Sequence, residues 1–164
     1  MLMLTTLVGC ASIAPRSASQ DSLSGRLSVR VESDPPRTLG AAFELAGDAE
    51  RGSLDLSTPL GTVLAQARWS PQEVALVTPQ ATRRYADLPG LTRDLLGEEL
   101  PVAALFDWLR GRPWAGAPSL QSPGEAGFVQ LGWQVSLARF DQGWVVAYRP
   151  ASPATTVRAV VDRP

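Results

Sequence analysis

The sequence predicts an α+β fold built on a curved antiparallel sheet with two inserted helices. Apolar and polar residues alternate in a series of short segments, which is the pattern of strands with one buried face. Between two groups of these segments the apolar spacing changes to three and four residues, which is typical of a helix. The length of 164 residues suits one domain with a substantial core.

The predicted strands follow one another through short turns rich in Gly, Pro or Asp, which indicates an antiparallel meander. Each strand is marked by apolar residues two positions apart: Leu27, Val29 and Val31; Leu39, Ala41, Phe43 and Leu45; Leu54 and Leu56; Val63, Ala65, Ala67 and Trp69; Val74 and Leu76; Leu131, Trp133, Val135 and Leu137; Trp144, Val146 and Tyr148; Val157, Ala159 and Val161. Asp141, Gln142 and Gly143 are expected to form the hairpin between the two long late strands.

Two helices are predicted between these groups of strands. The first has an N-cap at Asp87 and ends before Gly97, and its apolar face consists of Leu88, Leu91, Leu95 and Leu96. The second begins at Pro101 and ends before Gly111, and its apolar side consists of Val102, Leu105, Trp108 and Leu109. Residues 111–127 are rich in Pro, Gly and Ser and are expected to form a loop.

A sheet with this many strands either closes into a barrel or stays open with its concave face covered by helices. Both predicted helices have wide apolar faces that need a partner. An open sheet covered by these helices would enclose an apolar cavity suited to acyl chains. Ordinary core packing remains the alternative for any single apolar residue, because most large apolar side chains lie in the interior.

The first ten residues have the form of a lipoprotein signal. An apolar run ends in Leu7, Val8, Gly9 and Cys10, which looks like a lipobox. The run is too short to cross a bilayer, which takes about 20 residues, but it suits the apolar region of a secretory signal. We therefore expect residues 1–9 to be a signal peptide and Cys10 to be acylated. The alternative is an apolar first strand with a buried thiol.

Residues 10–24 are expected to form a lipidated flexible tether, followed by a folded domain over residues 25–164. The segment from Ala14 to Ser24 is rich in Ser and Ala and lacks periodicity. In lipoproteins of this type, Asp directly after the acylated Cys marks retention at the inner membrane. Ala11 occupies that position here. We therefore expect attachment through Cys10 to the periplasmic face of the outer membrane.

The composition argues against several classes of function. The chain has no His and one Cys, which removes the commonest general base, the commonest metal ligand and any multi-cysteine metal site. The net charge of −1 gives no basic footprint for nucleic acid. Acidic neighbours such as Glu98 and Glu99, or Asp48 and Glu50, are better interpreted as solvated turns and helix ends than as catalytic pairs. We expect no enzymatic activity, cofactor, metal or nucleic-acid partner.

Four segments resemble the LolB family of outer-membrane lipoprotein receptors. They are Gly-Arg-Leu at residues 25–27, Ser-Thr-Pro-Leu-Gly-Thr at 57–62, Leu-Phe-Asp-Trp-Leu-Arg-Gly-Arg-Pro at 105–113, and Gly-Trp-Gln-Val at 132–135. The segments recur in the family's order, and with the lipobox they span nearly the whole mature chain.

The resemblance implies an incomplete, half-open β-barrel with helices over its concave face. It further implies that a monomer accepts acylated lipoproteins from the periplasmic carrier LolA and releases them into outer-membrane lipids without covalent chemistry. Leu60, held between Pro59 and Gly61, would be the exposed loop residue that enters lipid, and Cys10 would be the anchor.

The acyl-chain cavity is expected among the large apolar residues of the strands and the second helix. The candidates are Phe43, Leu45, Leu54, Leu56, Trp69, Leu105, Trp108, Leu109, Trp133, Val135 and Trp144. Two other functions remain open: a lipid-binding lipoprotein of similar fold, which would not need an exposed Leu60, and a structural envelope lipoprotein, which would have a filled core and an apolar outer patch.

Overall fold

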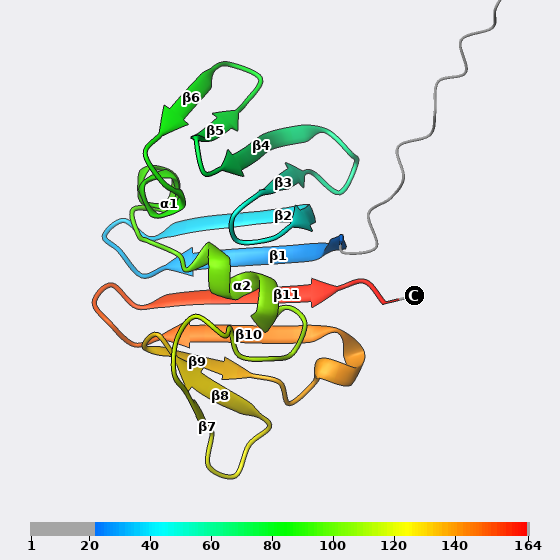
Figure 1. Cartoon of the computed structure of the whole chain (residues 1–164), viewed down its shortest axis with the longest axis vertical. Helices are drawn as coiled ribbons and strands as arrows, with labels where there is room; N and C mark the ends of the chain where they lie inside the picture. The colour runs from blue at the N-terminus through cyan, green and yellow to red at the C-terminus, as the bar shows by residue number, and fades with distance from the viewer. Residues whose placement is uncertain (1–21, 164) are drawn as a thin grey trace, which may run out of the picture.

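A computed structural model describes residues 22–163 (Figure 1). Cys10, the expected signal peptide and most of the expected tether lie outside these residues. The strands are β1 (Leu23–Val31), β2 (Arg37–Gly47), β3 (Gly52–Ser57), β4 (Val63–Ser70), β5 (Glu73–Val77), β6 (Thr82–Tyr85), β7 (Ser119–Gln121), β8 (Gly127–Gln130), β9 (Trp133–Ser136), β10 (Trp144–Arg149) and β11 (Thr155–Val161). The helices are α1 (Leu88–Leu96), α2 (Val102–Trp108) and the short 3-10 helix η1 (Phe140–Gln142).

Within the described residues, eleven strands form one antiparallel sheet in the order β6-β5-β4-β3-β2-β1-β11-β10-β9-β8-β7. The first and last strands meet at its centre, where Gly25 is opposite Val161 (Figure 1). β6 and β7 are the two edges and do not pair with each other, so the sheet is not closed. The predicted antiparallel sheet with two inserted helices is therefore confirmed, whereas an enclosed cavity stays a prediction.

The predicted first helix has the predicted bounds. The Asp87 carboxylate accepts a hydrogen bond of 2.7 Å from the backbone N–H of Gly90, which satisfies a free donor of the first turn. Gly97 adopts φ of 78° and its N–H donates to the carbonyl of Arg93, which ends the helix. Leu91 and Leu96 are buried, whereas Leu95 is exposed, contrary to the prediction. α2 is shorter than predicted, and its chain continues as turns after Trp108.

The structure shows which face of β10 points inward, a question that the sequence leaves open. Val145 and Ala147 are buried opposite Ala159 and Val157 of β11, and Trp144 and Val146 lie on the other face. Five consecutive apolar residues begin this strand, so its alternation carries no information about which face is inward. The pairing with β11 determines which face of β10 points inward.

Other differences concern polar or short elements. β7 lies within the segment expected to be a loop, and the hairpin expected at residues 141–143 contains η1, followed by Gly143 at φ of 83°. Leu131 adopts φ of 54° in the turn before β9 and so does not extend that strand. β1 begins at Leu23, two residues before the expected domain boundary.

None of the helices within residues 22–163 is long and apolar enough to cross a membrane.

Candidate functional site

α2 contacts both arms of the open sheet through two aromatic side chains. The ring of Phe106 packs edge-on against Trp69 of β4, with centroids 5.8 Å apart. Trp108, which is fully buried, packs against Phe128 of β8 at 6.4 Å and Trp133 of β9 at 6.0 Å. Because these partners come from opposite sides of the central strands, α2 joins the two arms across the front of the sheet in Figure 1.

A buried glutamine fixes α2 and the following loop to the second arm. The Oε1 atom of Gln130 accepts hydrogen bonds from the Trp108 indole at 2.8 Å and from the backbone N–H of Trp114 at 2.9 Å. Its Nε2 atom donates to the carbonyls of Trp114 and Ala117, both at 2.7 Å. Gln130 is 1% exposed, so these four bonds satisfy a polar group that would otherwise be costly to bury.

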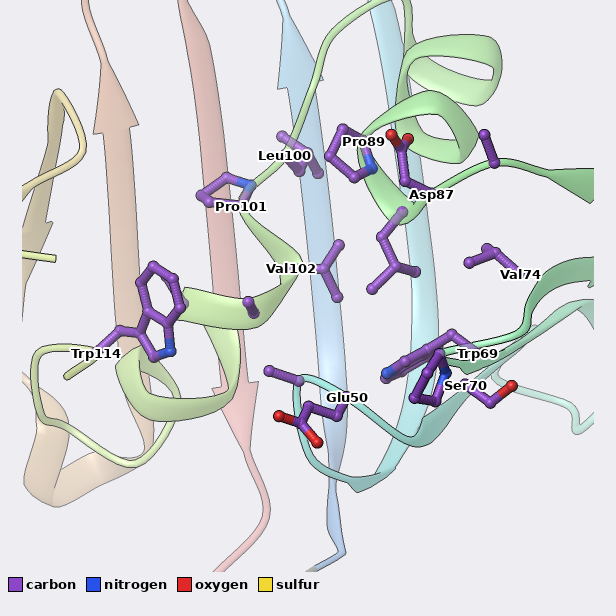
Figure 2. Close-up of a pocket in the computed structure, with 16 residues that line it drawn as sticks. Glu50, Trp69, Ser70, Val74, Asp87, Pro89, Leu100, Pro101, Val102 and Trp114 are labelled. Atoms are coloured by element: carbon purple, nitrogen blue, oxygen red, sulfur yellow. The ribbon is translucent and has the colours of Figure 1, made fainter. Parts of the chain in front are cut away.

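A cleft of about 630 Å³ lies beside α2. Its walls come from β4, β5, the start of α1 and the segment leading into α2. Figure 2 shows Trp114 and Trp69 at opposite sides of this cleft, with Val102 between them. Leu88, Leu100 and Val74 add apolar surface. This volume is within the range of sites that bind a small apolar ligand.

The polar groups around the cleft are occupied locally. The Trp69 indole donates to the carbonyl of Asp48 at 3.0 Å. The backbone N–H groups of Arg51 and Glu50 both donate to the Asp48 carboxylate and lower its pKa. Asp87 is engaged as the N-cap of α1. Within residues 22–163 no group of three or more His, Cys, Asp and Glu side chains could hold a metal ion. The arrangement is suited to non-covalent binding of an apolar chain.

The structure brings most of the predicted cavity residues together in one core. Eight are buried: Phe43, Leu45, Leu56, Trp69, Trp108, Leu109, Trp133 and Val135. Leu54 and Leu105 are partly buried against them. Trp144 lies on the opposite face of β10 from this core, where the Arg139 guanidinium is 4.8 Å from its ring centroid. Of the eleven candidates, Trp69 is the one that lines the cleft itself.

Four residues important to this site were not predicted from the sequence. Phe106 is 4% exposed and Leu100 is 6% exposed, yet both fall outside the predicted apolar stripe of the second helix. Trp114 lies in a segment expected to be a loop, where a lone Trp among Pro and Gly was an available indication of packing. Gln130 could not have been recognised, because burial of a polar residue depends on partners distant in sequence.

The predicted membrane-insertion loop forms a rigid turn with Leu60 at its tip. The N–H of Gly61 donates to the carbonyl of Thr58 at 2.9 Å, and the N–H of Thr58 donates to the carbonyl of Thr62 at 2.8 Å. Pro59 restricts the backbone, and Gly61 adopts φ of 85°, which favours glycine. The Leu60 side chain is 95% exposed. An apolar side chain held this far from the core has no stabilising role in the fold.

Comparison with known proteins gives the family. The family model for the outer membrane lipoprotein LolB matches residues 19–160. The LolB protein of Bordetella petrii is 35% identical over 82% of this chain and 74% of its own length. That of Bordetella pertussis is 34% identical over 99% of this chain and 90% of its own length, and that of Ralstonia nicotianae is 36% identical over 79% and 69%. The chain belongs to the LolB family of outer membrane lipoproteins.

Proposed function

We propose that this protein receives acylated lipoproteins from the periplasmic carrier LolA and inserts them into the outer membrane. The observation that carries the proposal is Leu60, a leucine that is 95% exposed at the tip of a rigid turn. Moving one leucine from water into lipid is favourable by roughly 1.5–3 kcal/mol. This gain is enough to disturb the bilayer locally, but it is too small to anchor the protein. Anchoring is the role of acylated Cys10.

The cleft beside α2 supports the acceptance step. Its apolar lining provides a place for an acyl chain between release from the carrier and entry into the membrane. Transfer without an energy source requires the cleft to bind acyl chains more tightly than the carrier does, and the membrane to bind them more tightly still. Differences in buried apolar surface are sufficient to set this order.

The experiment follows the two transfer steps separately with the Leu60→Glu variant. A loaded carrier is mixed with the variant, and the acquired cargo is then offered to outer-membrane vesicles. We expect acceptance at the normal rate, because Leu60 is absent from the cleft lining, and a loss of release into vesicles. A variant with impaired acceptance and normal release would contradict the assigned role of Leu60.

Leu120→Glu is the matched control, because Leu120 is also a strongly exposed leucine, at 72%, but lies on the edge strand β7. We expect this variant to accept and release cargo normally. If the unmodified protein accepts no acylated cargo, the receptor function is rejected. A structural or small-lipid-binding lipoprotein then becomes the better account.

A further inference from the structure

The hairpin of β3 and β4 has a tip without charges. Residues 56–67 contain no Asp, Glu, Arg or Lys, and the flanking Asp55 and Arg68 form an ion pair with each other at its base. Beyond this pair, the tip presents Thr, Ser and Gln as its polar side chains. A segment that enters the interfacial region of a bilayer avoids the cost of desolvating charges. The absence of charges extends over residues 56–67, well beyond Leu60 itself.

Two further apolar side chains near the tip are exposed. Val63 is 46% exposed and Leu64 is 37% exposed. Consecutive residues of a strand point to opposite faces, so neither face of the sheet is covered at this position. The pairing of β4 with β5 begins only at Gln66, which leaves the first residues of β4 beyond the end of that neighbour. The hairpin therefore projects from the body of the protein with apolar side chains on both faces.

The start of the folded chain lies beside this hairpin. Ser24 and Gly25 of β1 line a shallow hollow of about 370 Å³ together with Gly61, Val63 and Asp162. Cys10 precedes Leu23 by 13 positions. At about 3.3–3.6 Å per residue, this segment reaches at most about 45 Å from its anchor. The chain that leads to the anchor thus leaves the domain on the side that carries the hairpin tip.

We infer that residues 57–64 contact the outer membrane as a unit, with Val63 and Leu64 entering the bilayer interface on either side of Leu60. This inference rests on the proposed function and extends it from one residue to a lipid-binding surface. The contact is apolar, so it requires no anionic lipid. The anchor at Cys10 keeps this surface close to the bilayer between rounds of transfer.

The test uses the full lipidated protein in vesicles of phosphatidylethanolamine and phosphatidylglycerol. The chain has one Cys, which is the proposed acylation site, so a cysteine introduced elsewhere is the free thiol for labelling. A polarity-sensitive fluorophore is placed at position 60, 63 or 64 in separate variants. Quenching by lipids that carry a spin label then reports contact with the bilayer. The control is Leu131→Cys, because Leu131 is 47% exposed, close to the 46% of Val63, but lies in the turn between β8 and β9.

We expect strong quenching at positions 60, 63 and 64 and little at 131. Quenching at 60 with only the control level at 63 and 64 would overturn this inference and leave the proposed role of Leu60 intact. Quenching at the control level at all three positions would overturn both. The two failures are therefore distinguishable.

A functional measurement accompanies the labelling. The double variant Val63→Ser/Leu64→Ser should release cargo into vesicles more slowly, on the order of ten-fold, because less apolar surface enters the lipid. The variant Val63→Ile/Leu64→Ile keeps the apolar surface and should release cargo at the normal rate. Normal release by the serine variant would overturn the inference. So would a steep decrease of release with added salt, because salt screens contacts between charges.

Discussion

Gly25 shows how closely the first and last strands approach at the centre of the sheet. A Cβ atom at this position would lie 2.0 Å from the carbonyl oxygen of Val160, and φ is 156°. We expect Gly25→Ala to lower the free energy of unfolding by roughly 3 kcal/mol or more, because it combines backbone strain with a clash against backbone. Gly40→Ala is the control, because a Cβ there meets nothing within 4 Å. Denaturant unfolding of both variants measures the difference, and equal stabilities would contradict it.

Gln130 is the polar residue on which the position of α2 depends. Gln130→Leu would leave the buried indole N–H of Trp108 and the partly buried backbone N–H of Trp114 without their acceptor. Each unsatisfied group costs about 1–3 kcal/mol, so we expect a loss of roughly 3 kcal/mol or more. Gln134→Leu on the neighbouring strand β9 is exposed and should have a small effect. The measurement is denaturant unfolding followed by Trp fluorescence, and similar midpoints for the two variants would be evidence against the role of Gln130.

At the level of elements, the sequence predicts those whose local chemistry is complete. α1 has its N-cap, its apolar spacing and its terminal glycine within eleven residues, and its bounds are predicted correctly. β10 has apolar residues on both faces, so its inward face is set by β11 and could not be predicted. β6 and β7 lie at the edges and contain mainly polar residues, so they lack the alternation by which strands are recognised.

In the candidate site too, features that depend on local sequence can be predicted, whereas features that depend on distant segments cannot. The exposure of Leu60 is an expectation that comes from the resemblance of residues 57–62 to the LolB family, and the local turn between Pro59 and Gly61 produces it. The lining of the cleft depends on which strands face α1 and α2, which is a long-range property. Trp69 is predicted because it belongs to a strand with clear apolar alternation. Trp114 lies in a segment expected to be a loop, and is not predicted.

The contact between β6 and α1 predicts a dependence of stability on pH. The hydroxyl of Tyr85 donates to the Asp94 carboxylate at 2.6 Å, and Arg83 pairs with it at 3.0 Å. The hydrogen bond from Tyr85, together with Arg83, lowers the pKa of Asp94 in the folded protein. A lowered folded pKa gives a stabilisation that is present above the pKa of the unfolded chain and is lost as the pH falls through the folded pKa.

We therefore expect Asp94→Asn to reduce the loss of stability between about pH 5 and pH 2. Asp141→Asn is the control, because Asp141 is an exposed carboxylate in η1, which connects β9 and β10 in the arm of the sheet that does not contain β6. Urea unfolding at several pH values provides the comparison. An Asp94→Asn protein with the same pH profile as the unmodified protein would show that this contact contributes nothing.

In the whole molecule, the open sheet has two arms that meet at β1 and β11, and a small number of contacts join them in front of the sheet. α2 is one connection, through Phe106 and Trp108. The second is an ion pair in which Arg149 of β10 donates to Glu98, in the segment between α1 and α2, at 2.6 Å. The guanidinium also lies 5.4 Å from the ring centroid of Trp133. These contacts join the arms in addition to the backbone pairing of β1 with β11.

The last prediction concerns the strength of this second connection. Both side chains of the pair are 21% exposed, so solvent screens them less than it screens a surface pair. A double-mutant cycle with Arg149→Met and Glu98→Gln should give a coupling free energy of about 1 kcal/mol. The matched control is the cycle for Arg30 and Glu32, whose side chains are 51% and 48% exposed and whose coupling should be smaller. Hydrogen exchange should also become faster in α2 when Arg149 is replaced, because α2 and the Glu98 segment are held on the same face. Equal couplings in the two cycles, with unchanged exchange in α2, would mean that α2 alone holds the arms together.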